Sequence, residues 1–393
     1  MLKNYLLTPG PTPIPHRVLE TMARPIIHHR TPEFQKIIQE VEEDLKYIYQ
    51  TKNEVLIFAS SGTGAMEASV VNLLSPGDKA VVIRGGKFGE RFGEICAAYG
   101  IEFIPLDVEW GKAVDPEKIR DILEEDERRT TNDSSTSLGA GERRIKAVYT
   151  TLCETSTGVA TDIESVAKIM KKYEAVLVVD AISGLAAIPL KTDEWGVDVV
   201  VSVSQKGLMI PPGLAFVSVS AKAWGLVEKS KLPKFYFDFK EYKKALSKVD
   251  TPFTPAVNLM IALREALKVI KEEGLEVIFE RHRKLALAVR NDVKALGLQL
   301  YAPTAYSDGV TAVNVPQGID GEKLVKTMRD KYGVGIAGGQ AELKGKVFRI
   351  ATMGYITASD LMVCIAALET VLSEMGYKFQ MGAGVRALEE TLK

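Results

Sequence analysis

The sequence predicts an α/β protein with a large, mostly parallel sheet domain and a smaller C-terminal α/β domain. Apolar, β-branched runs alternate with helical patterns from about residue 31 to residue 220, and strands separated by helices pair in parallel. After a long helical stretch at 255–273, the same alternation begins again on a smaller scale. We therefore expect an N-terminal arm at 1–15, a large domain at 16–260 and a small domain at 261–393.

A helix beginning near Pro32 opens the large domain, because proline is tolerated in the first helical turn. Its apolar residues recur at helical spacing: Phe34, Ile37, Ile38, Val41 and Leu45. Short apolar runs predict strands, and amphipathic runs between them predict helices. The strands are expected at 55–58, 80–83, 101–105, 148–152, 176–179, 197–203 and 214–219, and the helices at 65–74, 88–98 and 116–125.

A polar segment at 126–143 interrupts this rhythm and nearly lacks apolar residues. We expect it to form a mobile surface loop and assign no chemistry to it. Alternation resumes in the small domain after the helix at 255–273. There we expect helices at 275–295, 320–331 and 357–375 and strands at 310–315 and 346–351.

The composition excludes several classes of partner. Of 393 residues, 46% are hydrophobic and 26% are charged, and the formal net charge is -1. This balance argues against nucleic acid or an anionic membrane as the main partner, because both favour a basic face. The four histidines have no metal-binding spacing, so we expect no metal site.

Cysteine usage and the N-terminal sequence indicate a cytoplasmic protein. The three cysteines, Cys96, Cys153 and Cys364, are widely spaced and suggest a reducing compartment rather than a disulfide framework. The N-terminus has no charged head followed by an apolar segment, so we expect no signal peptide. No apolar run approaches the ~20 residues that a membrane span requires.

A single lysine follows the β-branched strand that ends at Ser204. Lys206 lies between Gln205 and Gly207, and a lysine at the end of an apolar strand is partly desolvated. Desolvation disfavours the ammonium and makes the neutral amine available for Schiff-base chemistry. The alternative is that Lys206 points into water, as most lysines do. The lysine alone does not decide between the two.

An aspartate ends the preceding apolar strand of the sequence. Asp180 closes the run from Val176, and the carboxyl ends of parallel strands converge on one crevice where ligands bind. An aspartate there can pair with a protonated pyridine nitrogen while a lysine forms an imine with an aldehyde, which is how pyridoxal phosphate is held. The alternative role of Asp180 is a helix cap or turn residue before Ala181.

A Ser/Gly turn provides a candidate phosphate cradle. Residues 60–64 (SSGTG) lie between the strand at 55–58 and the following helix. Small residues let the backbone approach closely, and the free N–H groups of the helix point at the anion. Such turns are common, and the flanking strand and helix make this one more specific.

Together these motifs resemble the class V pyridoxal-phosphate aminotransferases of fold type I, in particular the alanine–glyoxylate and serine–pyruvate (serine–glyoxylate) group. The resemblance covers nearly the whole chain in the family's order. The matching segments are 7–12 (LTPGPT), 61–63 (SGT), 88–89 (FG), 154–158 (ETSTG), Asp180, 204–206 (SQK), 211–213 (PPG), 251–254 (TPFT) and Arg349.

The resemblance implies pyridoxal 5′-phosphate as cofactor, with Lys206 as the Schiff-base lysine and the base that moves the substrate α-proton. Asp180 would keep the pyridine nitrogen protonated, and Phe88 would stack on the ring, although Phe88 as ordinary helix core is a competing interpretation. Thr155 would bond the phenolic oxygen, with Ser156 beside it.

The resemblance also assigns the phosphate ligands and an assembly. Thr251 and Thr254 would reach the phosphate from a neighbouring subunit, so we expect a homodimer with its active sites at the interface. The alternative for both threonines is a helix start. The ligands expected from the same subunit are Ser61, Gly62, Thr63 and Gln205.

Arg349 matches the arginine that takes the substrate α-carboxylate in this family. A planar guanidinium forms two parallel hydrogen bonds with a carboxylate. Apolar neighbours (Val347, Phe348 and Ile350) favour this role over a solvated edge position. Gly10 in the N-terminal arm would help to close the substrate pocket.

Two departures from the family lie near the expected pocket. Relatives often carry a histidine in the segment that reads RIATMG here, at 349–354. Leu152 and Cys153 stand where the animal enzymes have a His-Gly pair. Both departures affect substrate preference more than cofactor use.

The expected activity is transfer of the amino group of a small L-amino acid, alanine or serine, to glyoxylate or pyruvate by a ping-pong mechanism. Alternatives are a 2-aminoethylphosphonate or phosphoserine transaminase and, more remotely, a cysteine desulfurase-type lyase. The lyase needs a mobile nucleophilic cysteine, whereas Cys364 lies in an apolar helix. The combination of Lys206, Asp180 and Arg349 argues against a non-enzymatic subunit.

Overall fold

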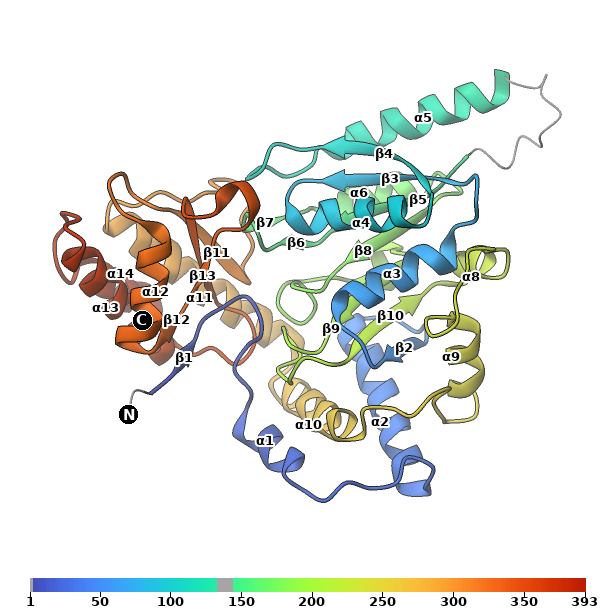
Figure 1. Ribbon diagram of the computed structural model, residues 1–393, viewed down its shortest axis with the longest axis horizontal. Coiled ribbons are helices and arrows are strands. Elements are labelled where there is room, and N and C mark those ends of the chain that lie inside the picture. The colour runs from blue at the N-terminus through green and yellow to red at the C-terminus, as the bar shows by residue number, and fades with distance from the viewer. Residues whose placement is uncertain (1–2, 133–143) are drawn as a thin grey trace.

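A computed structural model describes residues 3–132 and 144–393 (Figure 1). The strands form two main sheets and two small ladders. The strands are β1 (Tyr5–Leu6), β2 (Val55–Phe58), β3 (Lys79–Arg84), β4 (Glu102–Asp107), β5 (Ile145–Thr151), β6 (Cys153–Glu154), β7 (Val159–Ala160), β8 (Val176–Asp180), β9 (Val199–Val203), β10 (Ala215–Val219), β11 (Val310–Asn314), β12 (Val334–Gly335), β13 (Ala337–Gly338) and β14 (Val347–Ala351).

The larger sheet has seven strands in the order β2-β10-β9-β8-β5-β3-β4. Its neighbours from β9 to β4 pair in parallel, whereas β10 runs antiparallel to both β2 and β9. The predicted mostly parallel sheet is therefore confirmed. Because β8 and β9 are adjacent and parallel, the residues that follow them lie at the same edge of the sheet.

Helices cover both faces of this sheet, as a parallel sheet requires (Figure 1). One core packs under α2, α6 and α10 and the other under α3, α4 and α9, and successive strand residues alternate between the two. The helices of this part of the chain are α1 (His16–Met22), α2 (Pro32–Tyr49), α3 (Gly62–Leu73), α4 (Lys87–Ala98), α5 (Pro116–Asn132), α6 (Ile163–Met170), α7 (Thr192–Trp195), α8 (Ala221–Val227), α9 (Phe239–Leu246) and α10 (Val257–Glu273).

A second body contains the three-stranded sheet β11-β14-β13 and the C-terminal helices (Figure 1). The N-terminal strand β1 joins it, since Tyr5 pairs with Val334 in a parallel ladder and Leu7 accepts a hydrogen bond from Ala351 N at 2.9 Å. The helices are α11 (Leu275–Ala295), α12 (Gly321–Tyr332), the 3-10 helix η1 (Ala341–Leu343), α13 (Ala358–Glu374) and α14 (Ala383–Leu392).

The structure corrects two predicted elements. The helix expected from residue 65 begins at Gly62, which places the candidate phosphate cradle in its first turn. The helix expected to end at residue 125 continues to Asn132. Glutamate and arginine at 127–129 have good helix propensity, so the lack of apolar residues after residue 125 does not end the helix. The rest of the expected loop, 133–143, lies outside the described residues.

No helix in the described part of the chain is long and apolar enough to cross a membrane. The domain boundaries expected at residues 15 and 260 stay predictions.

Candidate active site

Lys206 lies in the turn after β9, and the N-terminal arm crosses it. Its Nζ donates a hydrogen bond to the carbonyl oxygen of Pro9, and Thr12 Oγ1 donates to the Lys206 carbonyl at 2.8 Å. A side chain on Gly10 would collide with the Lys206 side chain, so the arm approaches this closely because residue 10 is glycine. Burial lowers the pKa of Lys206 to about 8. The lysine is not a solvated surface residue.

Asp180 lies at the end of β8 and is 2% exposed. Its Oδ1 accepts a hydrogen bond from Ile182 N at 2.8 Å, which is the turn role that the sequence left open. Its Oδ2 accepts none from the described residues. Burial, followed by the nearby charge of Glu154, raises the pKa of Asp180 to about 7. Asp180 therefore keeps one oxygen for a further partner, and a cationic partner there would favour the ionised carboxylate.

The first turn of α3 offers an anion site. The N–H groups of Gly62 and Thr63 have no preceding helical carbonyl, and Ser61 at the N-cap makes no side-chain cap bond. A Cβ on Gly62 would lie 2.6 Å from Ile182 Cδ1, so a larger residue here would have to displace the Ile182 side chain or the first turn of the helix. Arg91 from α4 donates to Thr63 Oγ1 at 3.3 Å and adds positive charge. This donor set suits a phosphate group.

Gln205, the fourth expected phosphate ligand of the same subunit, lies beside Lys206. It is half-buried, and Ser204 Oγ lies 3.4 Å from its Oε1. Its backbone carbonyl accepts a hydrogen bond from Thr12 N at 3.2 Å. Its side-chain amide N–H groups keep their hydrogen-bonding capacity.

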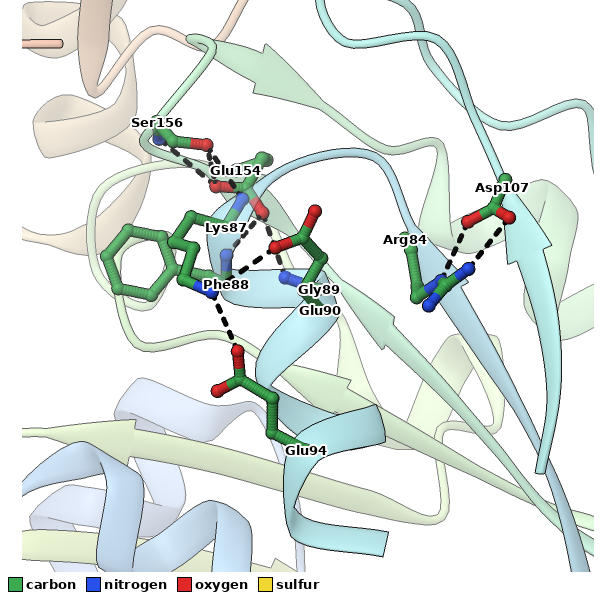
Figure 2. A network of polar contacts seen from close by, with 9 residues as sticks. All are labelled: Arg84, Lys87, Phe88, Gly89, Glu90, Glu94, Asp107, Glu154 and Ser156. Atoms are coloured by element: carbon green, nitrogen blue, oxygen red, sulfur yellow. Dashed lines mark hydrogen bonds and ion pairs between the residues drawn. The ribbon is translucent and has the colours of Figure 1, made fainter. Parts of the chain in front are cut away.

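Phe88 lies in the first turn of α4, beside the loop that carries Glu154 and Ser156 (Figure 2). It is half-buried and belongs to neither core of the large sheet, so the competing interpretation as helix core is wrong. The guanidinium of Arg91 lies 5.0 Å from the centre of its ring. A half-exposed flat ring at this position can stack on an aromatic cofactor.

Thr155 and Ser156 are both buried. Ser156 Oγ donates to Glu154 Oε1 at 2.5 Å and accepts from Lys87 N at 3.1 Å (Figure 2). The Ser156 hydroxyl is therefore engaged within the protein, whereas the Thr155 hydroxyl makes no hydrogen bond to the described residues. Thr155 is the better placed of the two to bond a ligand.

Arg349 is held by backbone carbonyls from two parts of the fold. Its Nε and Nη2 donate to Gly338 O at 3.0 and 2.6 Å, and its Nη1 donates to Thr155 O at 2.8 Å. A guanidinium has five N–H groups, so one on Nη1 and one on Nη2 stay free. Burial lowers the pKa of Arg349 to about 10, and the side chain is 5% exposed. A buried arginine with two free donors is suited to a carboxylate.

Thr251 and Thr254 lie on the loop before α10, and no hydrogen bond joins them to Lys206, Asp180 or Arg349 in the described chain. Thr251 Oγ1 donates to Phe253 O at 2.8 Å, and Thr254 is exposed. The alternative role as a helix start is not observed, because α10 begins at Val257 after an Ala256 N-cap. A single chain does not bring these threonines into the site.

Sequence reasoning gave no role to two buried groups beside the site. His282 accepts a hydrogen bond from Gly354 N at 3.1 Å through Nε2, and burial lowers the pKa of its imidazole to about 4. Glu154 accepts hydrogen bonds from α4 and from Ser156. The position of Glu154 ahead of TSTG in the recognised motif could have indicated a role in the site, whereas nothing in the sequence around His282 indicated one.

The cysteines are all buried. Cys364 lies in α13 and is 0% exposed, and burial raises the pKa of its thiol. The expectation that it belongs to a helix core is confirmed.

A family model described as aminotransferase class-V matches residues 4–366. The chain belongs to this family. Among curated relatives of the class V aminotransferase, "Soluble hydrogenase, small subunit" of Synechococcus sp. (strain PCC 6716) is 45% identical, with 99% of this chain and 98% of the relative covered. "Serine--glyoxylate aminotransferase" of Hyphomicrobium methylovorum is 38% identical, with 98% and 94% covered.

A solved structure of an alanine–glyoxylate aminotransferase from Nostoc sp. superimposes on the class V aminotransferase with a TM-score of 0.87, 30% identity and coverage of 95% of this chain and 96% of the other. The recognition of the family and of fold type I from sequence motifs is thereby confirmed.

Proposed function

We propose that this class V aminotransferase uses pyridoxal 5′-phosphate to move the amino group of a small L-amino acid, alanine or serine, to glyoxylate or pyruvate. The observation that carries the proposal is the convergence of Lys206 and Asp180 at the ends of adjacent parallel strands. The amine has a lowered pKa and the carboxyl keeps a free oxygen. Amino-group transfer through a pyridine aldehyde needs both.

The residues present fit this cofactor. Asp180 Oδ2 would hold the protonated pyridine nitrogen, the ring of Phe88 would stack on the pyridine, and the Thr155 hydroxyl would bond the phenolic oxygen. When bound, the cofactor supplies an electron sink for the α-carbon of the substrate. The ligands of its phosphate would be Ser61, Gly62, Thr63 and Gln205, and Ser156, next to Thr155, would hold this loop through its hydrogen bond to Glu154.

Lys206 would act as the acid–base group at the substrate α-carbon. With a pKa of about 8, roughly a tenth of the amine is neutral at pH 7, far more than for an ordinary lysine, and the neutral form would accept the α-proton. The arm residues Pro9 and Gly10 lie against the same amine and would exclude water from it.

Arg349 would orient the substrate through its two free N–H groups. A carboxylate that accepts both is fixed in the plane of the guanidinium, which places the α-carbon for proton transfer. The names of the serine–glyoxylate and alanine–glyoxylate relatives support glyoxylate as amino acceptor and serine or alanine as donor.

We propose that Thr251 and Thr254 complete the site of a second copy, so that the active unit is a homodimer. The loop is half-exposed, and the stacked rings of Tyr236 and Phe253, 5.1 Å apart, stiffen it beside the strongly exposed Phe235. Mixing Lys206→Ala with a Thr251→Val/Thr254→Val chain tests this assignment, since the mixed dimer contains one intact site. Recovered activity supports shared sites, and two inactive pools that stay inactive after subunit exchange contradict them.

The alternative substrates differ in their charge. Phosphoserine carries a phosphate besides its carboxylate and needs a further cation, and 2-aminoethylphosphonate has a phosphonate and no α-carboxylate, whereas the two free donors of Arg349 are matched by one carboxylate. A desulfurase-type reaction would need an accessible thiol, and Cys364 is buried.

The test is a single half-reaction followed by visible absorbance. Protein loaded with pyridoxal phosphate is mixed separately with L-alanine, L-serine, L-aspartate, phosphoserine and 2-aminoethylphosphonate. Loss of the absorbance of the lysine-bound cofactor, together with the matching 2-oxo acid, is expected for alanine or serine. Release of ammonia from serine while the absorbance of the lysine-bound cofactor persists, or a response to the phosphorus-containing donors alone, would contradict the proposal.

A further inference from the structure

We propose that Glu154 is a positioning residue for the site: its carboxylate fixes the start of α4, and with it the Phe88 ring, against the loop whose Thr155 carbonyl holds Arg349. The inference rests on the proposed function, because it concerns how the cofactor-facing groups are held.

Glu154 is the centre of a buried hydrogen-bond network (Figure 2). Its Oε2 accepts from Phe88 N at 3.0 Å and from Gly89 N at 2.9 Å. Its Oε1 accepts from Ser156 N at 3.1 Å and from Ser156 Oγ at 2.5 Å. The two oxygens thus bind two different segments, so the carboxylate links them rather than capping one.

The neighbouring packing leaves little freedom in this link. A Cβ on Gly86, just before α4, would lie 2.6 Å from Ser156 Oγ and would collide with the Glu154 side chain. Ser156 Oγ also accepts from Lys87 N at 3.1 Å, which adds a second tie between the same segments. The start of α4 and the 154–156 loop are therefore joined by direct hydrogen bonds.

The network connects to groups on both the cofactor side and the substrate side of the proposed site. Phe88, whose N–H binds Glu154, carries the ring that would face the cofactor. On the other side, the carbonyl of Thr155, the residue next to Glu154, accepts from Arg349 Nη1. A change in Glu154 is expected to tilt the ring and loosen the guanidinium at once, because both depend on one loop.

A role in holding the site explains the buried carboxylate of Glu154 better than packing alone does. Burial raises the pKa of Glu154, whereas its hydrogen bonds lower it, so a carboxylate at this place is costly without them. Its charge also contributes to the raised pKa of Asp180. One side chain therefore acts on Phe88, Arg349 and Asp180.

Glu154→Gln is the informative variant, because it keeps the volume and replaces one acceptor oxygen by a donor. The amide can still accept from one segment, but its NH₂ then faces backbone N–H groups of the other. The matched control is Glu94→Gln on α4, where the carboxylate contacts Lys87 Nζ at 2.7 Å and is 58% exposed (Figure 2).

The experiment measures the dissociation constant of pyridoxal phosphate from the apoprotein and the visible circular dichroism of the bound cofactor. We expect Glu154→Gln to weaken binding about tenfold or more and to change the dichroism per bound cofactor. Glu94→Gln should match the wild type in both. Loss of thermal stability with an unchanged dissociation constant and dichroism would show a structural role only and overturn the inference.

A second measurement covers the case in which Glu154→Gln does not fold. Hydrogen exchange in the wild-type apoprotein should show protected amides at Phe88 and Gly89, which a first helical turn leaves exposed to exchange when it has no acceptor. Exchange at the rate of an unstructured chain would overturn the inference. Failure of the wild type itself to bind pyridoxal phosphate would instead overturn the proposed function.

Discussion

Arg349 Nη1 donates a hydrogen bond to the carbonyl of Thr155 at 2.8 Å. This contact joins β14 of the three-stranded sheet to the loop after β6, which belongs to the large body. Because Gly338 O accepts from Nε and Nη2 of the same guanidinium, the arginine is held in place before any substrate arrives. A preorganised donor pair loses little freedom on binding a carboxylate.

Arg349→Lys should impair substrate binding far more than cofactor binding. Lysine keeps the positive charge but lacks the planar fork, and we expect kcat/KM for the amino donor to fall by ~30-fold to 1000-fold, mostly through KM. Steady-state kinetics and a pyridoxal phosphate titration measure the two effects. Arg329→Lys, an exposed arginine paired with Asp330, is the control. A KM equal to that of the wild type would contradict the role of Arg349.

Lys206→Ala should abolish turnover, with a loss of kcat that exceeds ~1000-fold, because it removes the amine that would move the α-proton. The variant is expected to bind pyridoxal phosphate non-covalently, since the phosphate and ring contacts remain. Turnover assays and equilibrium dialysis test both parts. Substantial residual turnover would mean that another residue moves the proton.

The amine of Lys206 should react at a lower pH than an ordinary lysine. Burial lowers its pKa from 10.5 to about 8, so the neutral, nucleophilic form dominates above that pH. The rate at which apoprotein captures pyridoxal phosphate should rise with pH to a midpoint near 8. A rate that continues to rise toward the pH range of an exposed lysine would contradict a desolvated amine.

Gly62→Ala should weaken pyridoxal phosphate binding, because the new Cβ would lie 2.6 Å from Ile182 Cδ1 and would displace the first turn of α3. We expect an increase in the dissociation constant of about tenfold. Adding Ile182→Val removes that methyl group and should restore part of the affinity. A double variant no better than Gly62→Ala would show that crowding is not the cause.

Asp292 should make the protein less stable as the pH rises. Both carboxyl oxygens are buried and have no hydrogen-bond partner among the residues that the structure describes, and burial raises the pKa of the carboxyl well above 3.8. Above pH 3.8 the unfolded chain releases this proton while the folded chain retains it, so stability falls with pH in that range.

Asp292→Leu is expected to remove that pH dependence and to stabilise the protein by ~2 kcal/mol at neutral pH. Thermal unfolding at several pH values measures the difference. If wild type and variant lose stability with pH in parallel, the slope comes from other groups.

The sheet edge that carries Lys206 and Asp180 could be predicted from the sequence because both residues follow strongly apolar strands. The runs at 176–180 and 199–203 are buried on both faces, and their apolar, β-branched composition predicts buried parallel strands. Short elements were missed, such as α6, α9 and α14, since their spans of 8 to 10 residues are shorter than the window of about 11 to 18 residues over which a helical period is recognised.

Contacts between distant segments could not be predicted. Two sets of hydrogen bonds depend on how the two bodies pack against each other. They are the bond from Lys206 to Pro9 and the bonds from Arg349 to Gly338 and Thr155. The engagement of the Ser156 hydroxyl by Glu154 likewise follows from packing against α4, which no spacing rule reports. The residues of the site could therefore be predicted from the sequence, whereas their hydrogen-bond partners could not.

The most direct test of the central claim is chemical trapping of the cofactor on its lysine. Protein loaded with pyridoxal phosphate is reduced with borohydride, which makes the C=N bond permanent, and the digested peptides are mapped by mass spectrometry. The account predicts a single major modified lysine, Lys206, and no modification after prior treatment with an effective amino donor. Cofactor attached chiefly to another lysine, or to none, would contradict it.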